Sequence, residues 1–154
     1  MTSLSIAEFD SGDIGGKDED ALVALFERAG LTRPWNDPRQ DIRFALAAPA
    51  STILVGRRPE DDHLVASVMV GHDGHRGAVY YVATDPDWRG QGFGREMMAA
   101  AEAWLAAKGI WKLNLLIRGD NEVAKGFYEA LGFHAQDRIC MQKEIPSAEK
   151  PQAD

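Results

Sequence analysis

The sequence predicts a three-layer α/β fold of the α+β type, in which helices cover both faces of a mixed, mostly antiparallel sheet. Three observations lead to this prediction. Short apolar runs typical of strands alternate along the chain with segments whose apolar residues recur at helical spacing. Two of the expected strands are separated only by a hairpin turn, and such strands pair antiparallel. Two others are connected through a helix, and strands connected in this way lie parallel with a right-handed crossover.

Length and composition are those of an ordinary globular domain. The chain has 154 residues, and we expect a single domain over residues 1–145 followed by a flexible tail over residues 146–154. A formal net charge of -7 argues against nucleic acid as a partner, because binding its backbone requires clustered Lys and Arg. The single cysteine, Cys140, excludes an intrachain disulfide framework, and we expect it to be buried. Neither a secretory signal nor a membrane-spanning apolar segment is found in the sequence, so we predict a cytoplasmic protein without a membrane partner.

The first part of the chain predicts one short strand and two helices. The strand is centred on residues 4–6. Residues 18–29 carry apolar side chains at helical spacing and acidic residues in the first turn, and Gly30 is placed to end this helix. Asp37 can cap a second helix that has Pro38 at its first position.

The middle of the chain predicts a run of strands and then a helix that packs on them. Residues 51–56 and 64–70 have the composition of strands. An Asp-Gly pair at residues 73–74 predicts a hairpin turn into a further strand over residues 78–83. A helix with an apolar face follows over residues 95–108.

The last part of the chain predicts a strand, a helix and closing strands. The strand covers residues 112–118, and it should be the parallel neighbour of the strand at residues 78–83. The helix covers residues 121–131 and ends at Gly132. One or two closing strands are expected within residues 133–145.

The most informative segment is the glycine-rich turn between a strand and the helix at residues 95–108. Gly90, Gly92 and Gly94 let the backbone turn tightly and expose successive N–H groups at a helix N-terminus, where phosphate is favoured. Arg89 adds formal charge. Such a turn alone fits a dinucleotide fingerprint, a triphosphate loop or a tight connection. Its spacing matches neither of the two nucleotide motifs.

Two segments resemble sequence motifs of the GNAT acetyltransferases. Residues 85–94, Asp-Pro-Asp-Trp-Arg-Gly-Gln-Gly-Phe-Gly, resemble the pyrophosphate-binding motif A of that family. Residues 121–133 resemble its motif B, with an Asn before the helix and a Tyr-Glu-x-x-Gly-Phe ending. The resemblance covers residues 53–144. Residues 33–38 and 73–77 also resemble segments of the YpeA subgroup of bacterial GNAT proteins.

The resemblance implies a GNAT-type three-layer α/β/α fold whose central sheet splays between the strands near Val82 and Leu115. It implies that acetyl-CoA is the acetyl donor and that its pantetheine arm binds in this gap like an added strand. In this assignment the Val82 N–H bonds the thioester carbonyl, Thr84 backbone groups hold the pantetheine, and the amides of residues 91–95 bind the pyrophosphate. The residues assigned to acetyl-CoA binding are Val82, Ala83, Thr84, Arg89, Gly90, Gln91, Gly92, Phe93, Gly94, Arg95 and Asn121.

The resemblance also implies that a neutral primary amine attacks the thioester directly, without a covalent cysteine intermediate. Tyr128 matches the family's tyrosine over the sulfur, so it is the candidate general acid that protonates the departing thiolate. Leu116 stands where the ribosomal-protein acetyltransferases of the superfamily carry a Glu, which argues against that substrate class. The general base stays open. The candidates for it are Asp41, Asp85, His72, His75 and a chain of water molecules.

The sequence leaves the acceptor open between a small-molecule amine and a protein amine. A closed pocket would favour the first and an open acidic groove the second. The candidate acceptor-site residues are Trp35, Asp73, His75 and Arg76. The last three of these fit a polar hairpin turn equally well. We expect no metal and allow for a homodimer, and the alternative to an enzyme is a non-catalytic acyl-CoA-binding sensor or interaction domain.

Overall fold

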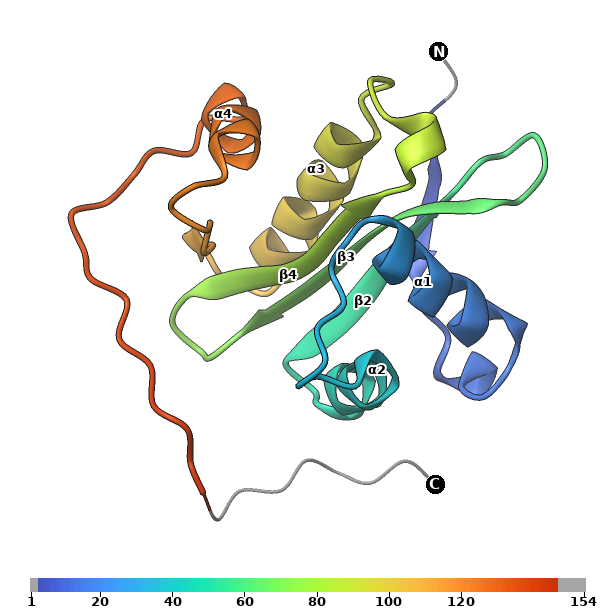
Figure 1. Ribbon diagram of the computed structural model, residues 1–154, viewed down its shortest axis with the longest axis horizontal. Coiled ribbons are helices and arrows are strands. Elements are labelled where there is room, and N and C mark those ends of the chain that lie inside the picture. Colours follow the sequence, from blue (N-terminus) through green and yellow to red (C-terminus); the bar gives the residue numbers. More distant parts are fainter. Residues whose placement is uncertain (1–2, 147–154) are drawn as a thin grey trace.

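The centre of the structure is a mixed sheet of five strands (Figure 1), counted within residues 3–146, which the computed structural model describes. The strands are β1 (Ser5–Glu8), β2 (Ser51–Arg57), β3 (Leu64–His72), β4 (Gly77–Thr84) and β5 (Leu113–Asn114). Their order in the sheet is the order in the sequence. Neighbours from β1 to β4 pair antiparallel, and β5 pairs parallel with β4. The predicted mixed, mostly antiparallel sheet is confirmed.

Helices cover both faces of this sheet. They are α1 (Lys17–Arg28), α2 (Pro38–Ala47), α3 (Phe93–Ala106) and α4 (Glu122–Ala130), with short 3-10 turns at Ser11–Asp13 and Pro86–Trp88. α1 and α2 pack on one face, and α3 and α4 on the other (Figure 1). The predicted three-layer α/β/α arrangement is therefore confirmed. Within residues 3–146, every helix is too short or too polar to span a bilayer.

Local sequence explains where the helices begin and end. The Asp37 carboxylate accepts a hydrogen bond from the Arg39 N–H at 2.9 Å, and Pro38 occupies the first turn of α2, as the sequence predicts. α1 has acidic residues in its first turn and ends two residues before Gly30. α4 ends two residues before Gly132. Caps and stops are local features, and they are the part of the fold that a sequence specifies most directly.

Each face of the sheet has its own apolar core. The core under α1 and α2 is centred on the fully buried side chains of Leu22, Phe26, Ile42 and Ile53. The core under α3 is centred on those of Val68, Val70, Met97, Met98 and Ala101. Met97 and Met98 of this set belong to the apolar face that the sequence predicts for the helix at residues 95–108. The sheet is thus held from both sides, and its edges and strand ends are left for other contacts.

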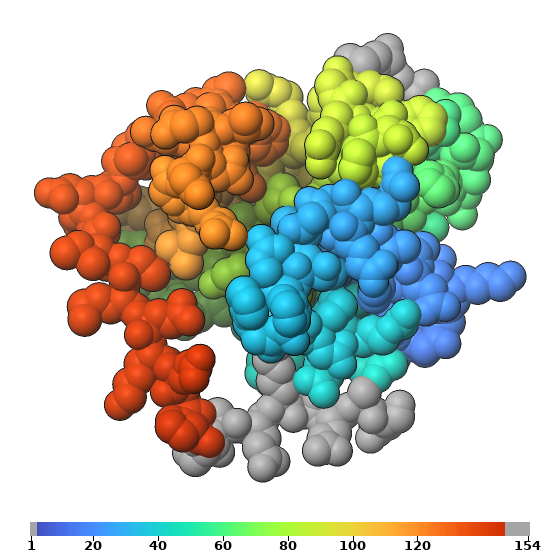
Figure 2. Space-filling model, viewed as in Figure 1, coloured from blue at the N-terminus to red at the C-terminus, as the bar shows by residue number. Residues whose placement is uncertain are grey.

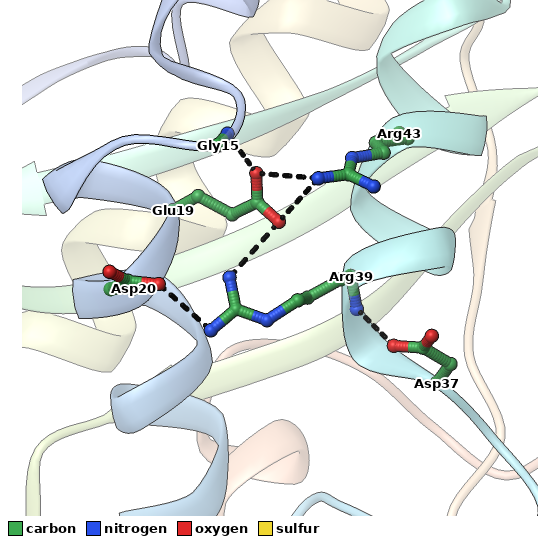
Figure 3. A network of polar contacts seen from close by, with 6 residues as sticks. All are labelled: Gly15, Glu19, Asp20, Asp37, Arg39 and Arg43. Carbon is green, nitrogen blue, oxygen red and sulfur yellow. Dashed lines mark hydrogen bonds and ion pairs between the residues drawn. The ribbon is translucent and has the colours of Figure 1, made fainter. Parts of the chain in front are cut away.

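A buried carboxylate ties α1 to α2 (Figure 3). Glu19 is fully buried, and it accepts hydrogen bonds from the Gly15 N–H and from the guanidinium groups of Arg39 and Arg43. Arg39 also pairs with Asp20 at 2.8 Å, near the protein surface. Burying a carboxylate is tolerated only with such partners, so this network fixes how the two helices sit against each other.

The C-terminal part of the chain differs from the predictions. The predicted closing strands within residues 133–145 are wrong, because these residues form no strand and are extended and exposed from residue 134 onward. The strand predicted over residues 112–118 is limited to Leu113–Asn114, because its pairing with β4 ends there. Cys140 is exposed and not buried, since it lies on this extended segment. The predicted flexible tail covers residues 146–154. All of these except residue 146 lie outside the described residues.

Candidate active site

β4 is interrupted by a β-bulge at Tyr81. Ser67 of β3 pairs with Ala83 and Met69 pairs with Tyr80, so one residue of β3 stands opposite two residues of β4. Tyr81 has φ 50°, in the left-handed region that costs a non-glycine residue about 1–3 kcal/mol. In a regular strand, consecutive side chains point to opposite faces. Because of the bulge, Tyr80 and Tyr81 instead line the same cavity.

The bulge also orients the peptide group between Tyr81 and Val82. The Ser67 hydroxyl donates a hydrogen bond to the Tyr81 carbonyl oxygen at 3.0 Å. The C=O and N–H of a trans peptide point in opposite directions, and the described peptide bonds are all trans. The Val82 N–H is therefore directed away from the Ser67 hydroxyl. Since the pairing of β4 with β5 ends at Ala78↔Asn114, β4 continues past the bulge without β5 beside it.

The N-terminus of α3 has no side-chain cap. Its N-cap residue is Gly92 with φ 82°, and Gly90 has φ 80°. A Cβ at either position would have nothing within 4 Å, so the turn is open on its outer side. Arg89 and Arg95 flank the turn and are exposed. Uncapped N–H groups at the positive end of a helix dipole, with cations beside them, form an arrangement that binds anions.

An ion pair holds the segment that leads from β4 into this turn. The buried Asp85 carboxylate accepts two hydrogen bonds from the Arg28 guanidinium, at 2.8 and 3.2 Å, and one from the Asp87 N–H at 2.9 Å. The hydrogen bonds from Arg28 lower the pKa of Asp85 below its ordinary value. A carboxylate held in this way is a poor proton acceptor, which argues against Asp85 among the predicted bases.

α4 packs against the beginning of α3. A Cβ on Gly94 would come within 3.0 Å of the Phe127 ring, so this ring lies directly on the α3 backbone. Tyr128 is half-buried beside it, in edge-to-face contact with Phe127 and Phe133 at centroid distances of 4.9 and 5.6 Å. Burial raises the pKa of Tyr128, so its hydroxyl stays protonated at neutral pH. A group in this state can donate a proton.

The residues predicted to bind acetyl-CoA fall on three connected places. Residues 82–84 end β4, and residues 89–95 form the glycine-rich turn and the start of α3. Asn121 precedes α4, and its side-chain oxygen accepts a hydrogen bond from the Ala124 N–H at 3.0 Å. Asn121 therefore caps α4, a structural role that sequence reasoning did not assign to it.

A cavity of about 820 Å³ lies on the α1/α2 face of the sheet, beside the bulge. Its walls come from α2, from β3 and β4 and from the hairpin that joins these strands. In Figure 2, β4 (green) is seen between the orange region around α4 and the light-blue segment between α1 and α2. The polar and aromatic side chains that line the cavity include those of Asn36, Asp41, Phe44, Asp73, Arg76, Tyr80 and Tyr81.

A tyrosine–carboxylate pair forms part of the cavity wall. The Tyr81 hydroxyl donates a hydrogen bond to the Asp41 carboxylate at 2.6 Å, and the Tyr81 ring stacks on Phe26 at a centroid distance of 4.3 Å. Burial, and then this hydrogen bond, raise the pKa of Tyr81, so the tyrosine remains the donor. The pair places a carboxylate from α2 next to the strained residue of β4.

The four predicted acceptor-site residues separate into two groups. Asp73 and Arg76 line the cavity, whereas His75 and Trp35 do not, and Trp35 is 77% exposed. Asp73 accepts hydrogen bonds from the N–H groups of His75 and Arg76, both at 2.8 Å, and these bonds lower its pKa. Asp73 thus shapes the hairpin turn, as the structural interpretation of this segment predicts, and also contributes to the cavity.

Comparison with known proteins decides the family. A model of the acetyltransferase (GNAT) family matches residues 20–133, most of the chain. The chain belongs to the GNAT family. An acetyltransferase of Yersinia pestis is 40% identical over 128 residues, which make up 83% of this chain and 89% of that relative. An acetyltransferase of Sodalis glossinidius is 40% identical over 124 residues, 80% and 86% of the two chains. The prediction of an acetyl-CoA-dependent N-acetyltransferase is confirmed, and its acceptor is undetermined.

Solved structures show the same GNAT fold. The aminoglycoside acetyltransferase AAC(6')-Iy, solved with a CoA bisubstrate analog, superposes with a TM-score of 0.76 at 15% identity and covers 94% of this chain and 99% of its own. An acetyltransferase from Clostridium acetobutylicum, solved with acetyl-CoA, superposes with a TM-score of 0.71 at 16% identity, covering 91% and 96%. At these identities the likeness establishes the fold.

Sequence reasoning did not predict the three aromatic residues that line the cavity, Phe44, Tyr80 and Tyr81. Tyr80 and Tyr81 are adjacent in a strand, and a period of two assigns them to opposite faces. Phe44 is exposed on α2 next to the cavity, where a helical pattern alone assigns a surface residue. The sequence of β4 held no signal for this bulge, because the bulge depends on the register of β4 against β3.

Proposed function

We propose that the protein transfers the acetyl group of acetyl-CoA to a small-molecule primary amine that binds as a cation in the cavity beside β4. The observation that carries this proposal is a cavity with a carboxylate beside the bulge of β4, followed along the chain by a stretch of β4 that β5 does not pair with and by the uncapped N-terminus of α3. The relatives at 40% identity support a further proposal, that the chain belongs to the YpeA-like subgroup of bacterial GNAT proteins.

The donor side is assigned to the start of α3. The amides of residues 91–95 would bind the pyrophosphate, and Arg89 and Arg95 would add charge. The open space outside Gly90 and Gly92 supports this assignment, because a phosphate needs that room against the backbone. The pantetheine arm would lie along β4 past Ala78, where β5 no longer pairs.

The chemistry is assigned to the Val82 N–H, which would bind the carbonyl oxygen, and to the Tyr128 hydroxyl, which would protonate the sulfur. When bound, acetyl-CoA supplies an acetyl group activated as a thioester. The Val82 N–H would donate a hydrogen bond to the carbonyl oxygen, and its orientation away from the Ser67 hydroxyl supports this role. The ammonium group of the acceptor would first lose one proton to water, and the neutral nitrogen would then bond to the carbonyl carbon. The C–S bond would break as the Tyr128 hydroxyl donates a proton to the leaving sulfur, and the proton released from the new amide nitrogen would return through water to the Tyr128 oxygen.

The acceptor side is assigned to the cavity. Asp41 and Asp73 supply negative charge for an ammonium group, and the rings of Phe44 and Tyr80 supply faces that attract cations. The cavity volume of about 820 Å³ is that of a small-molecule site. The volume of this cavity fits a small amine, and its two carboxylates fit an amine that enters as a cation, although Arg76 also lines the cavity.

Calorimetric titration with acetyl-CoA tests the donor side. Gly92→Asp places a negative charge at the predicted pyrophosphate site, and at about 4 Å two like charges repel by about 4 kcal/mol at the effective dielectric of a protein surface. We expect the affinity for acetyl-CoA to fall at least about tenfold. Gly109→Asp is the matched control, because Gly109 has φ 80° and lies beyond the other end of α3. Equal affinities of the two variants would overturn the assignment.

A further inference from the structure

The cavity wall contains an arginine that a purely cationic ligand does not explain. Arg76 is the only arginine or lysine that lines the cavity within the described residues, and Asp41 and Asp73 are the carboxylates of the same wall. A guanidinium group repels an ammonium group that binds close to it. Arg76 would therefore weaken the binding of a plain amine unless the chain or the ligand supplies it with a negative partner.

The chain does not supply that partner within residues 3–146. None of the ion pairs among these residues includes Arg76. Its Nη1 lies 3.2 Å from the carbonyl oxygen of His75 and 3.4 Å from the Nδ1 of the same residue, and its guanidinium carbon lies 5.3 Å from the centre of the Trp111 ring. These contacts hold the guanidinium in place, and they leave most of its N–H donors for another group.

The carboxylate in the same hairpin turn has other partners. The Asp73 Oδ1 accepts hydrogen bonds from the N–H groups of His75 and Arg76, so this carboxylate stabilises the backbone of the turn. His72, which also lines the cavity, accepts the Gly74 N–H on its Nδ1 at 3.0 Å, so the proton of its neutral ring is on Nε2. The hairpin thus contributes a guanidinium and an imidazole N–H to the cavity wall, and both are donors.

Arg76 and Asp41 are separated along β4. Arg76 lies in the hairpin immediately before this strand, whereas Asp41 is bonded by the hydroxyl of Tyr81, at the bulge further along it (Figure 1). A strand rises by about 3.3 Å per residue, so the chain from Arg76 to Tyr81 covers about 16 Å. The Arg76 side chain can bridge part of this distance. A ligand that contacts both groups therefore needs about 10–16 Å between its two charges.

We infer that the acceptor is an amine that also carries a carboxylate about 10–16 Å from its nitrogen, and that Arg76 binds this carboxylate while the amine lies beside Asp41. This inference rests on the proposed function, because it names the class of acceptor for that site. The planar guanidinium matches the two oxygens of a carboxylate. A phosphate fits less well, because the cavity wall offers a single arginine and Asp73 lies in the same turn.

Steady-state kinetics with tetraglycine and its C-terminal amide tests the inference. An extended chain of four residues spans about 14 Å, and the two probes differ in the charge at one end. We expect kcat/KM to be at least about tenfold higher for tetraglycine than for the amide. Glycine is too short to contact both Arg76 and Asp41, so its kcat/KM should not depend specifically on Arg76.

Two variants assign the preference to one side chain. Arg76→Gln should remove most of the preference for tetraglycine over its amide, because it takes away the charge that binds the carboxylate. Lys112→Gln is the matched control, since Lys112 also lies beside the Trp111 ring, at 4.6 Å, but does not line the cavity. It should keep the preference. Circular dichroism shows whether each variant is folded.

Calorimetric titration of tetraglycine in the presence of CoA measures the same contact without acetyl transfer. We expect Arg76→Gln to weaken this binding at least about tenfold and Lys112→Gln to leave it within about twofold. Acetylation of both probes without a preference, or a preference that Arg76→Gln leaves unchanged, would overturn the inference while the proposed function stands. Binding that depends on Arg76 without acetylation of either probe would support the carboxylate site and overturn the proposed transfer. Neither binding nor acetylation would overturn both.

Discussion

Removal of the Glu19 carboxylate tests how α1 and α2 are held together. In Glu19→Ala the Gly15 N–H and the Arg43 guanidinium lose their partner inside the protein. Arg43 is the more costly group, because its side chain is only 20% exposed and its Nε already has no hydrogen-bond partner. Arg39 is more exposed and can turn toward water or Asp20. Breaking one side of a buried ion pair costs about 3–5 kcal/mol, and the exposure of Arg39 places the expected loss near about 3 kcal/mol.

Urea unfolding followed by circular dichroism measures this loss. With a denaturant dependence of about 2 kcal/mol per molar, the midpoint should fall by about 1.5 M. Asp20→Asn is the matched control, because it removes the neighbouring carboxylate, which is 67% exposed, and should cost less than about 1 kcal/mol. If the losses for Glu19→Ala and Asp20→Asn agree within about 1 kcal/mol, the network does not fix the two helices.

The remaining predictions concern pH, the acid and the acceptor. Arg28 lowers the pKa of Asp85, so this ion pair stabilises the fold fully above the pKa that the carboxyl has in the unfolded chain. That stabilisation is lost as the pH falls through the lower pKa of the folded state. In Asp85→Asn the melting temperature should therefore fall less steeply with decreasing pH than in the wild type, as measured by thermal unfolding. Tyr128→Phe should lower kcat by about 10²-fold or more while acetyl-CoA affinity measured by calorimetry stays unchanged, and an unchanged kcat would remove the acid assignment. Asp41→Asn should raise KM for a cationic amine at least about tenfold with little change in the affinity for acetyl-CoA, and an unchanged KM would place the acceptor elsewhere.

The sequence specified the parts of the fold that depend on neighbouring residues. Asp37 and Pro38 begin α2, and Gly30 follows the end of α1, because caps and stops act over a few positions. The glycine-rich turn was predicted for the same reason, since three glycines before a helix act locally. The family resemblance then assigned Tyr128 a role that its own pattern does not distinguish from packing.

The parts that were wrong or missed depend on contacts between distant segments. The bulge at Tyr81 depends on its register against β3, which no periodicity in β4 reveals. The strand predicted around Ile139 and Met141 was wrong, because alternation describes composition alone, whereas a strand also needs a partner edge, which is a long-range property. The cavity combines residues of α2 with residues of β3 and β4, so it follows only from the tertiary structure.

The bulge in β4 has a consequence for how specificity can change over evolution. The turn that we propose to bind the pyrophosphate lies at the start of α3, whereas the cavity wall is formed by α2 and by the hairpin before β4. Tyr81 connects the two regions. Its side chain lines the cavity and bonds Asp41, and its carbonyl belongs to the peptide group that leads into Val82 and the turn before α3. Under the proposed function, substitutions at Phe44 or Asp73 would therefore change which amine is accepted and leave the start of α3 unchanged. A substitution at Tyr81 would alter both the cavity wall and the orientation of the Val82 peptide group.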